Sequence, residues 1–174
     1  PDQVLVVVDG IVSKSFNDLI LKLKKKYSFE LIFLNEKLGL DKSLNIALTK
    51  CRNEIVFRAD GDDINLENRF ELQLPFLLSG YDVVGSSIDE YDENGEYLTS
   101  KKVPLSNKDI KKLIPFRNPI NHMTVGFLKK SVLEVEGYPE LFLKGDYGLW
   151  IKLISKNKKF INLQKPLVKV TAGS

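Results

Sequence analysis

The amino-acid sequence predicts an α/β fold with a mostly parallel central sheet and helices on both faces. Three apolar runs, rich in valine, isoleucine and leucine, precede residue 60, and amphipathic segments of roughly 10–15 residues separate them. Such an alternation is typical of strand–helix–strand units, in which helices cover buried parallel strands. A chain of 174 residues is long enough to form one such domain with a buried core.

Each element of the first half follows from its local pattern. The β-branched run over residues 4–8 ends at Asp9-Gly10 and predicts a buried strand followed by a turn. Ser15 and Asp41 stand before amphipathic segments, and we expect them to be the N-caps of two helices. The other elements expected in this half are strands over 29–34 and 55–59 and a helix over 66–78, which Pro75 kinks or stops early.

The second half of the chain is less regular. The expected elements are strands over 81–90, 96–98, 124–128, 160–163 and 167–170, and helices over 107–114, near Ser131 and from Asp146 to Ser155. Residues 92–95 predict a tight turn between two strands. The sequence contains no internal repeat, low-complexity tract or linker, so we expect residues 1–174 to form a single domain.

Three carboxylates crowd the end of the third predicted strand, in the run Asp60-Gly61-Asp62-Asp63. Open α/β sheets bind ligands outside the carboxyl ends of their strands, and crowded like charges favour a cation or a ligand that carries one. An EF-hand loop is excluded, because Ile64 and Asn65 occupy positions that need an oxygen ligand and a glycine. A helix N-cap at Asp62 or Asp63 explains one aspartate and not three. The pattern therefore favours a divalent metal that holds an anionic substrate.

Three further positions admit both a structural and a functional interpretation. Asp9 either forms a turn or binds a ligand, and the sheet edge that it shares with Asp60 favours binding. Asp146 either caps the following helix, whose core stripe includes Trp150, or acts as a general base for an acceptor hydroxyl. Taken alone, Asp146 favours the cap. The loop over 117–125 either orders around a substrate or orders itself through side-chain to backbone bonds.

Bulk properties exclude several functional classes. The net charge of +3 and the pI of about 8.8 give no sign of nucleic-acid binding, and no aromatic residues interleave the basic ones. The lysine-rich run over 22–26 is typical of a solvated helix end and leaves only a weak attraction to an anionic membrane surface. Cys51 is the only cysteine, which excludes a disulfide or a thiolate metal site. No apolar stretch approaches the ~20 residues of a membrane span and no secretory signal is present, so we expect a cytoplasmic location.

Several short segments follow one another in a characteristic order. They are Val8-Asp9-Gly10, Leu34-Asn35-Glu36-Lys37-Leu38-Gly39-Leu40, Leu44-Asn45-Ile46-Ala47-Leu48 and Arg58-Ala59-Asp60-Gly61-Asp62-Asp63, then Asp82-Val83-Val84-Gly85-Ser86, Arg117-Asn118-Pro119-Ile120-Asn121-His122 and Asp146-Tyr147-Gly148-Leu149-Trp150. Their order and spacing resemble the family 2 glycosyltransferases, which have a GT-A, Rossmann-like fold. The later segments are similar to the branch that builds bacterial exopolysaccharides, the amylovoran-type transferases. The resemblance runs from Pro1 to about Val170.

This resemblance implies a metal-dependent, inverting transfer of a sugar to a saccharide or lipid-linked acceptor in cell-surface polysaccharide synthesis, with a UDP-sugar as the expected donor. The site residues that it implies are Asp9, Asp60 and Asp62 for the nucleotide sugar, Asp60, Asp62 and Asp63 for Mn²⁺ or Mg²⁺, Asp146 as the catalytic base, and Asn118, Asn121, His122 and Trp150 on the acceptor side. Residues 1–90 would form the nucleotide-sugar half and residues 91–174 the acceptor half. A place at the inner face of the membrane is compatible with a lipid-linked acceptor.

Three features depart from the family pattern. Val8 stands where the family has a second acid before the turn, and Gly145 stands where it has a glutamate beside the base. The family's first strand, which lies centrally in the sheet, would precede Pro1, and without it neighbouring strands would have unpaired edges. Gly145 and the missing first strand favour an alternative in which the domain only binds nucleotide, sugar or a partner enzyme. A HAD-type phosphatase is a weaker alternative, because Ile64 replaces the usual Thr or Val and three strand–helix units precede Asp60.

Overall fold

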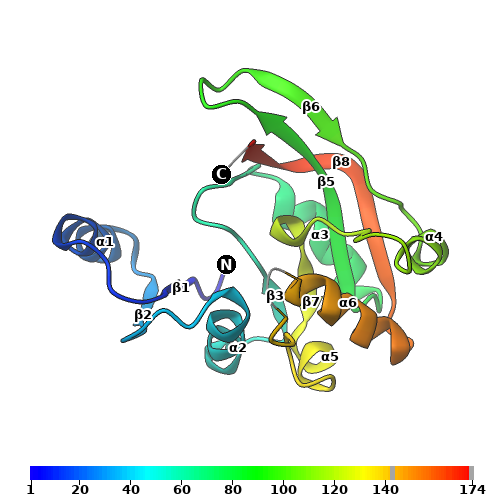
Figure 1. Cartoon of the computed structure of the whole chain (residues 1–174), viewed down its shortest axis with the longest axis horizontal. Coiled ribbons are helices and arrows are strands. Elements are labelled where there is room, and N and C mark those ends of the chain that lie inside the picture. Colours follow the sequence, from blue (N-terminus) through cyan, green and yellow to red (C-terminus); the bar gives the residue numbers. More distant parts are fainter. Residues whose placement is uncertain (142–143, 173–174) are drawn as a thin grey trace.

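The computed structural model of the chain describes residues 1–141 and 144–172 (Figure 1). The strands in these residues are β1 (Leu5–Val8), β2 (Glu30–Phe33), β3 (Ile55–Phe57), β4 (Ile64–Asn65), β5 (Val83–Tyr91), β6 (Tyr97–Lys101), β7 (Gly126–Leu128) and β8 (Phe160–Thr171). The helices are α1 (Lys14–Tyr27), α2 (Leu40–Lys50), α3 (Arg69–Leu78), α4 (Asn107–Leu113), α5 (Lys129–Leu133) and α6 (Gly145–Ser155), with a 3₁₀ turn η1 (His122–Thr124).

The strands form two sheets of different size. β1 and β2 pair in parallel, whereas the larger sheet has the order β3-β7-β5-β8-β4, with β6 beside β5. β5 is parallel to β8, but β3 and β5 are antiparallel to β7, and β4 is antiparallel to β8. The α/β class is therefore confirmed, and the prediction of a mostly parallel sheet is wrong. A hairpin explains the antiparallel pair of β5 and β6, whereas the other antiparallel pairs join strands far apart in the chain, whose relative direction no local pattern sets.

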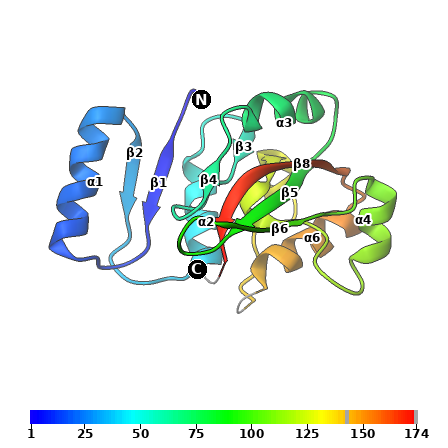
Figure 2. The ribbon, with the colours of Figure 1, turned by 90° about the horizontal axis from the view of Figure 1, so that it is seen from above.

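Helices cover both faces of the larger sheet, as the sequence predicts. Figure 2 shows α3 on one side of β5 and β8, and α4 and α6 on the other. Leu149, Trp150 and Leu153 of α6 are fully buried against Ile110 of α4 and Phe160 of β8. Each such side chain contributes about 1.5–3 kcal/mol through burial, and together they fix the axis of α6 and the place of its first turn. Among the described residues no helix has both the length and the apolar character that crossing a membrane requires.

Two predicted helix caps are wrong, each by two residues. Ser13, and not Ser15, caps α1, because its hydroxyl accepts the Phe16 N–H at 3.2 Å. The N-cap of α2 is Gly39, so Asp41 lies inside the first turn of that helix and its carboxylate is free to make other contacts.

Two prolines, Pro75 and Pro166, lie inside a helix and a strand of the structure. Pro75 lies inside α3 without ending it, since it faces solvent, where water can hydrate the carbonyl that it frees. The two short strands predicted at 160–163 and 167–170 are one strand, β8. Its pairing with β5 shifts register opposite Pro166, because proline has no N–H to donate to the ladder.

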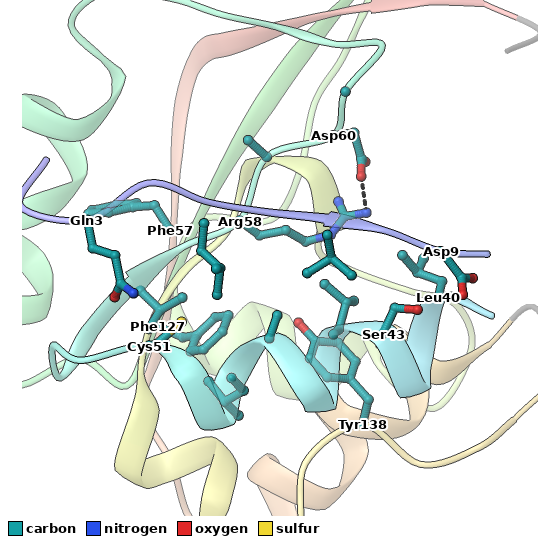
Figure 3. A pocket seen from close by; sticks show the side chains of 18 of the residues that line it. Gln3, Asp9, Leu40, Ser43, Cys51, Phe57, Arg58, Asp60, Phe127 and Tyr138 are labelled. Atoms are coloured by element: carbon teal, nitrogen blue, oxygen red, sulfur yellow. Dashed lines mark hydrogen bonds and ion pairs between the residues drawn. The ribbon is translucent and has the colours of Figure 1, made fainter. Parts of the chain in front are cut away.

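A cavity of about 590 Å³ separates β1 from β3 (Figure 3). Apolar side chains of β1, α2 and β3 line most of it, among them Val7, Ala47 and Phe57. Within residues 1–141 and 144–172, β1 pairs only with β2 and β3 only with β7, so the two edges that face the cavity belong to no ladder. Figure 1 accordingly shows α1, β1 and β2 as a unit at one side of the molecule.

Candidate functional site

Asp9 follows β1 and holds the turn that leads into α2. One of its carboxylate oxygens accepts the Leu38 N–H at 2.8 Å, and the other accepts the Gly39 N–H at 2.9 Å. Gly39 has a φ of +88°, a conformation that only glycine adopts without strain. Asp9 also lies on the rim of the cavity, as does Asp60. Asp9 thus stabilises the turn before α2, a role that the sequence did not predict, and its contact with a nucleotide stays a prediction.

Arg58 and Asp60 form an ion pair at the polar end of the cavity (Figure 3). The Arg58 side chain is only 7% exposed, compared with 28% for Asp60. Its Nε and Nη1 atoms are buried and have no hydrogen-bond partner among the described residues. A buried donor without a partner costs about 1–3 kcal/mol, so a ligand oxygen in the cavity would be stabilised by these groups. Sequence reasoning missed Arg58, and the only signal was a charged residue ending a buried apolar run.

Arg69 of α3 fixes the backbone on both sides of the acidic run. It is fully buried and donates to the carbonyl oxygens of Arg58 at 2.8 Å and Val125 at 3.1 Å. Its other N–H groups bind the side chains of Asn65 and Gln73. Burial, and then the charge of Arg58, lower the pKa of Arg69 to about 10, so it stays protonated at neutral pH. Arg69 was also missed, because nothing in the sequence shows that this face of α3 packs under β3.

The acidic run carries more negative charge than its surroundings neutralise. Burial raises the pKa of Asp63 to about 6, and the charges of Asp60 and Asp62 add to this effect, while Arg58 and Arg69 oppose it. Asp62 itself is exposed. Neither Asp62 nor Asp63 caps α3, which begins at Arg69, so the cap alternative is wrong for this run.

The three carboxylates do not form a complete metal cage. Among the described residues no group of three His, Cys, Asp or Glu side chains is arranged to hold a metal ion. Mg²⁺ in nucleotide sites is usually bound by one or two carboxylates and completes its shell with substrate phosphates and waters. The repulsion that raises the pKa of Asp63 is what a divalent cation would relieve. The residues therefore fit a cation that binds together with a diphosphate.

Asp146 lies in the first turn of α6 and does not cap it. The helix begins at Gly145, and its N-cap is Lys144, without a side-chain cap bond. The prediction of Asp146 as an N-cap is wrong, because that position falls two residues earlier. The half-buried carboxylate instead accepts a hydrogen bond of 2.6 Å from Asn118 Nδ2. One donor thus orients Asp146 and leaves acceptor capacity free.

The loop before β7 makes side-chain to backbone hydrogen bonds of its own, while ordering around a substrate stays a prediction. Asn118 Oδ1 accepts the Ile120 N–H at 3.2 Å, and Asn121 Nδ2 donates to the Ser86 carbonyl at 3.0 Å. Of the four residues predicted on the acceptor side, only Asn118 is exposed.

His122 and Trp150 support the site from the core. Burial lowers the pKa of His122 well below its usual value, and its Nε2 lies 3.1 Å from the Tyr138 hydroxyl. The His122 ring centroid is 5.9 Å from that of Trp150, which has no exposed surface. The predicted acceptor contact of Trp150 is therefore corrected to a packing role, because α6 turns this side chain inward.

The buried hydroxyl of Tyr138 connects the two ends of the site. Burial raises the pKa of Tyr138 far above its usual value, Arg58 opposes this, and the charges of Asp146, Asp41 and Asp60 add to it. The Tyr138 hydroxyl thus lies within electrostatic reach of Asp60 and of Asp146, which are far apart in sequence. Tyr138 also lines the cavity, as Asp60 does.

Comparison with known proteins agrees with this geometry. The family model described as glycosyl transferase family 2 matches residues 1–136. This chain belongs to glycosyltransferase family 2. The match covers β1 to α5, including the acidic run and the loop with Asn118. Membership in this family, which the sequence segments predicted, removes the HAD-type phosphatase alternative.

Curated bacterial relatives match almost the whole chain. The amylovoran biosynthesis glycosyltransferase AmsE of Erwinia amylovora is 37% identical over 175 residues, which cover 99% of this chain and 65% of the relative. The UDP-Gal:alpha-D-GlcNAc-diphosphoundecaprenol beta-1,3-galactosyltransferase of Escherichia coli is 36% identical over 171 residues, with 97% and 62% covered. The chain thus spans slightly less than two thirds of the length of these family 2 relatives.

Solved structures confirm the GT-A fold of this family 2 domain. Staphylococcus aureus TarS in complex with UDP-GlcNAc superposes with a TM-score of 0.75 at 19% identity, covering 99% of this chain and 50% of TarS. The mannosyltransferase PcManGT of Pyrobaculum calidifontis, in complex with GDP-Man and Mn²⁺, gives a TM-score of 0.67 at 15% identity, with 97% and 47% covered. At these identities the likeness concerns the fold.

Proposed function

We propose that this domain transfers a sugar from a UDP-sugar to a hydroxyl of a saccharide or lipid-linked acceptor in bacterial cell-surface polysaccharide synthesis. One observation carries the proposal: the buried Arg58 guanidinium, paired with Asp60 at the cavity, has N–H groups without a partner among the described residues. Residues 1–90 supply the donor-side groups, and residues 91–174 supply Asp146 and Asn118. The names of the Erwinia and Escherichia relatives support the pathway and the lipid-linked acceptor.

The donor side combines an anion-binding group with a cation-binding run. The unpartnered N–H groups of Arg58 suit an oxygen of the nucleotide diphosphate, and Asp9 and Asp60 share its rim. Asp62 and Asp63, with Asp60, would hold Mn²⁺ or Mg²⁺ against that diphosphate. When bound, the cation supplies charge stabilisation for the departing UDP. The UDP-GlcNAc complex of TarS and the Mn²⁺ complex of PcManGT support both assignments.

Asp146 is the proposed general base. It accepts the proton of the acceptor hydroxyl while that oxygen bonds to the anomeric carbon, and the bonding pair of the old C–O bond leaves with UDP. Attack from the face opposite to UDP inverts the anomeric centre. General-base assistance of this kind contributes about 10²–10⁴-fold in rate. Asn118 Nδ2 keeps the carboxylate in place during this step.

The place of action that fits this chemistry is the inner face of the cytoplasmic membrane, where a lipid-linked acceptor is presented. The last turn of α1 carries Lys24, Lys25 and Lys26, all exposed. Basic side chains near an anionic bilayer contribute about 1 kcal/mol each, enough to support peripheral association.

Binding and turnover test the proposal separately. Calorimetry with UDP and Mn²⁺ should show binding that Asp62→Ala weakens at least about tenfold, because one cation ligand is lost. Transfer from UDP-sugars should fall about 10²–10⁴-fold in Asp146→Asn, with UDP affinity unchanged. Asp18→Asn, an exposed substitution on α1, is the matched control and should change neither property. Full turnover in Asp146→Asn removes Asp146 from the mechanism, and UDP binding without turnover by the native protein supports the nucleotide-binding alternative.

A further inference from the structure

Gly145, the first residue of α6, has no room for a side chain. A carbon atom placed at its Cβ position would lie 1.8 Å from Asp41 Oδ1, 2.1 Å from Asp41 Cγ and 2.2 Å from Asp41 Oδ2. Real Cβ atoms essentially never approach another heavy atom closer than about 3 Å. The carboxylate of Asp41, from the first turn of α2, therefore occupies the space that a side chain at position 145 would fill.

The position of Asp41 is fixed by the contacts of α2 with the segment before α6. Asn45, one turn after Asp41, donates to the Tyr138 carbonyl at 2.9 Å and accepts the Tyr138 N–H at 2.9 Å. Lys42 forms an ion pair of 3.2 Å with Glu140. Because side chains four residues apart lie on the same helix face, Asn45 places Asp41 against α6. Asp9 accepts hydrogen bonds from the Leu38 and Gly39 N–H groups just before α2. Asp9 therefore also connects the start of α2, where Asp41 lies, to the proposed donor side.

Asp41 and Asp146 lie close enough to repel each other. Burial raises the pKa of Asp41, the Leu141 backbone N–H lowers it, and the charges of Asp146 and Glu140 raise it further. Lys42 faces Glu140 rather than Asp41. Both carboxylates lie at the N-terminal end of α6, where the helix dipole stabilises negative charge. The first turn of α6 thus holds a pair of acids that come from different helices.

We propose, on the basis of the function proposed above, that Asp41 is a positioning residue for the transfer reaction. Its carboxylate, seated against Gly145, orients the first turn of α6 and keeps a second negative charge beside the base Asp146. Glycine at position 145 leaves the space that this carboxylate from α2 fills. Asp41 and Gly145 are therefore a coupled pair.

A stability cycle tests the placement without any activity measurement. Gly145→Ala is expected to lower the Tm by more than about 4 °C in the native sequence, because its Cβ collides with Asp41. In the Asp41→Gly background the same change should leave the Tm within about 1 °C or raise it, since alanine is the better helix former. A loss of the same size in both backgrounds overturns the placement.

Charge relocation tests the role in transfer. Asp41→Asn keeps the shape and is expected to lower kcat about tenfold, with KM for the UDP-sugar and the Tm nearly unchanged. The exchange Asp41→Gly with Gly145→Glu should have a kcat at least about fivefold above that of its matched control, Asp41→Gly with Gly145→Gln, which fills the same space without charge. Equal rates for the two exchanges, or native kcat in Asp41→Asn, overturn the proposal. A native protein that transfers no sugar refutes the proposed function together with this role, while the stability cycle still decides the placement of Asp41.

Discussion

Replacing Asp63 with asparagine should stabilise the protein at neutral pH, although it removes a proposed cation ligand. The side chain keeps its size and loses the charge that Asp60 and Asp62 repel. Since the pKa of Asp63 is about 6 in the folded protein and near 3.8 when the group is free, the folded protein binds more protons between those pH values. Its stability therefore falls as the pH rises from about 4 to 6, and the full penalty is present above pH 6.

The size of this penalty follows from the two pKa values. A difference of about 2.2 corresponds to about 3 kcal/mol if no solvent screening acted. Asp63 is only partly buried, so screening by water reduces this to about 1–1.5 kcal/mol. For a domain of this length, that range corresponds to a gain of about 2–6 °C in Tm.

Thermal unfolding in the presence of EDTA, at pH 4.0 and pH 7.5, measures this effect. We expect Asp63→Asn to raise the Tm at pH 7.5 and to change it far less at pH 4.0, where Asp63 is protonated in the folded protein and only a small part of the penalty is present. Asp18→Asn on the exposed face of α1 serves as the control and should be neutral at both pH values. A gain of equal size at both pH values, or a loss at pH 7.5, would refute the reasoning, because the effect would then not arise from the charge.

Four further outcomes follow from the same contacts. Adding Mn²⁺ with UDP should raise the Tm of the native protein more than that of Asp63→Asn, and equal gains would exclude Asp63 as a cation ligand. Arg69→Met should lower the free energy of unfolding in urea by about 3–5 kcal/mol, because the Arg58 carbonyl and the side-chain oxygens of Asn65 and Gln73 lose the donor that Arg69 supplies; a loss below about 1 kcal/mol would contradict this. Asn118→Ala should reduce kcat about tenfold at constant KM for the donor, since Asp146 loses its orienting bond, and an unchanged kcat would show that the bond is dispensable. Burial raises the pKa of the Cys51 thiol, so iodoacetamide at pH 7.5 should modify it at least about tenfold more slowly in the native protein than in urea, and equal rates would place the thiol at the surface.

The apolar runs and acidic turns were sufficient to predict the fold class and the placement of Asp9 and Asp60 after strands. Residues 5–8 and 55–57 form strands because β-branched and aromatic side chains suit a buried pleated surface, and Asp9 and Asp60 follow them because turns end the runs. These are local effects, which a single segment of sequence contains. The resemblance of several segments to the family was needed to predict roles for residues in the second half of the chain, among them Asn118 and Asp146.

Strand direction and helix caps were predicted less well, because they depend on partners elsewhere in the chain. The pattern of β7 fits either direction beside β3, and only the return of the chain through η1 makes it antiparallel. Asp41 and Asp146 are both suitable caps by residue type. Each instead lies inside a first turn, because the packing of α2 and α6 brings their carboxylates toward one another.

The sequence by itself determined the family, the α/β character and the acids at the ends of the strands, since these depend on residue type and spacing. Only the tertiary structure decided which groups complete the site. It placed the Arg58 guanidinium at the cavity, buried Trp150 away from it and seated Asp41 against Gly145. The physical reason is that burial, unpaired hydrogen-bond donors and close approach depend on segments that are distant in the sequence and meet only in the fold. No local pattern of residues can predict them.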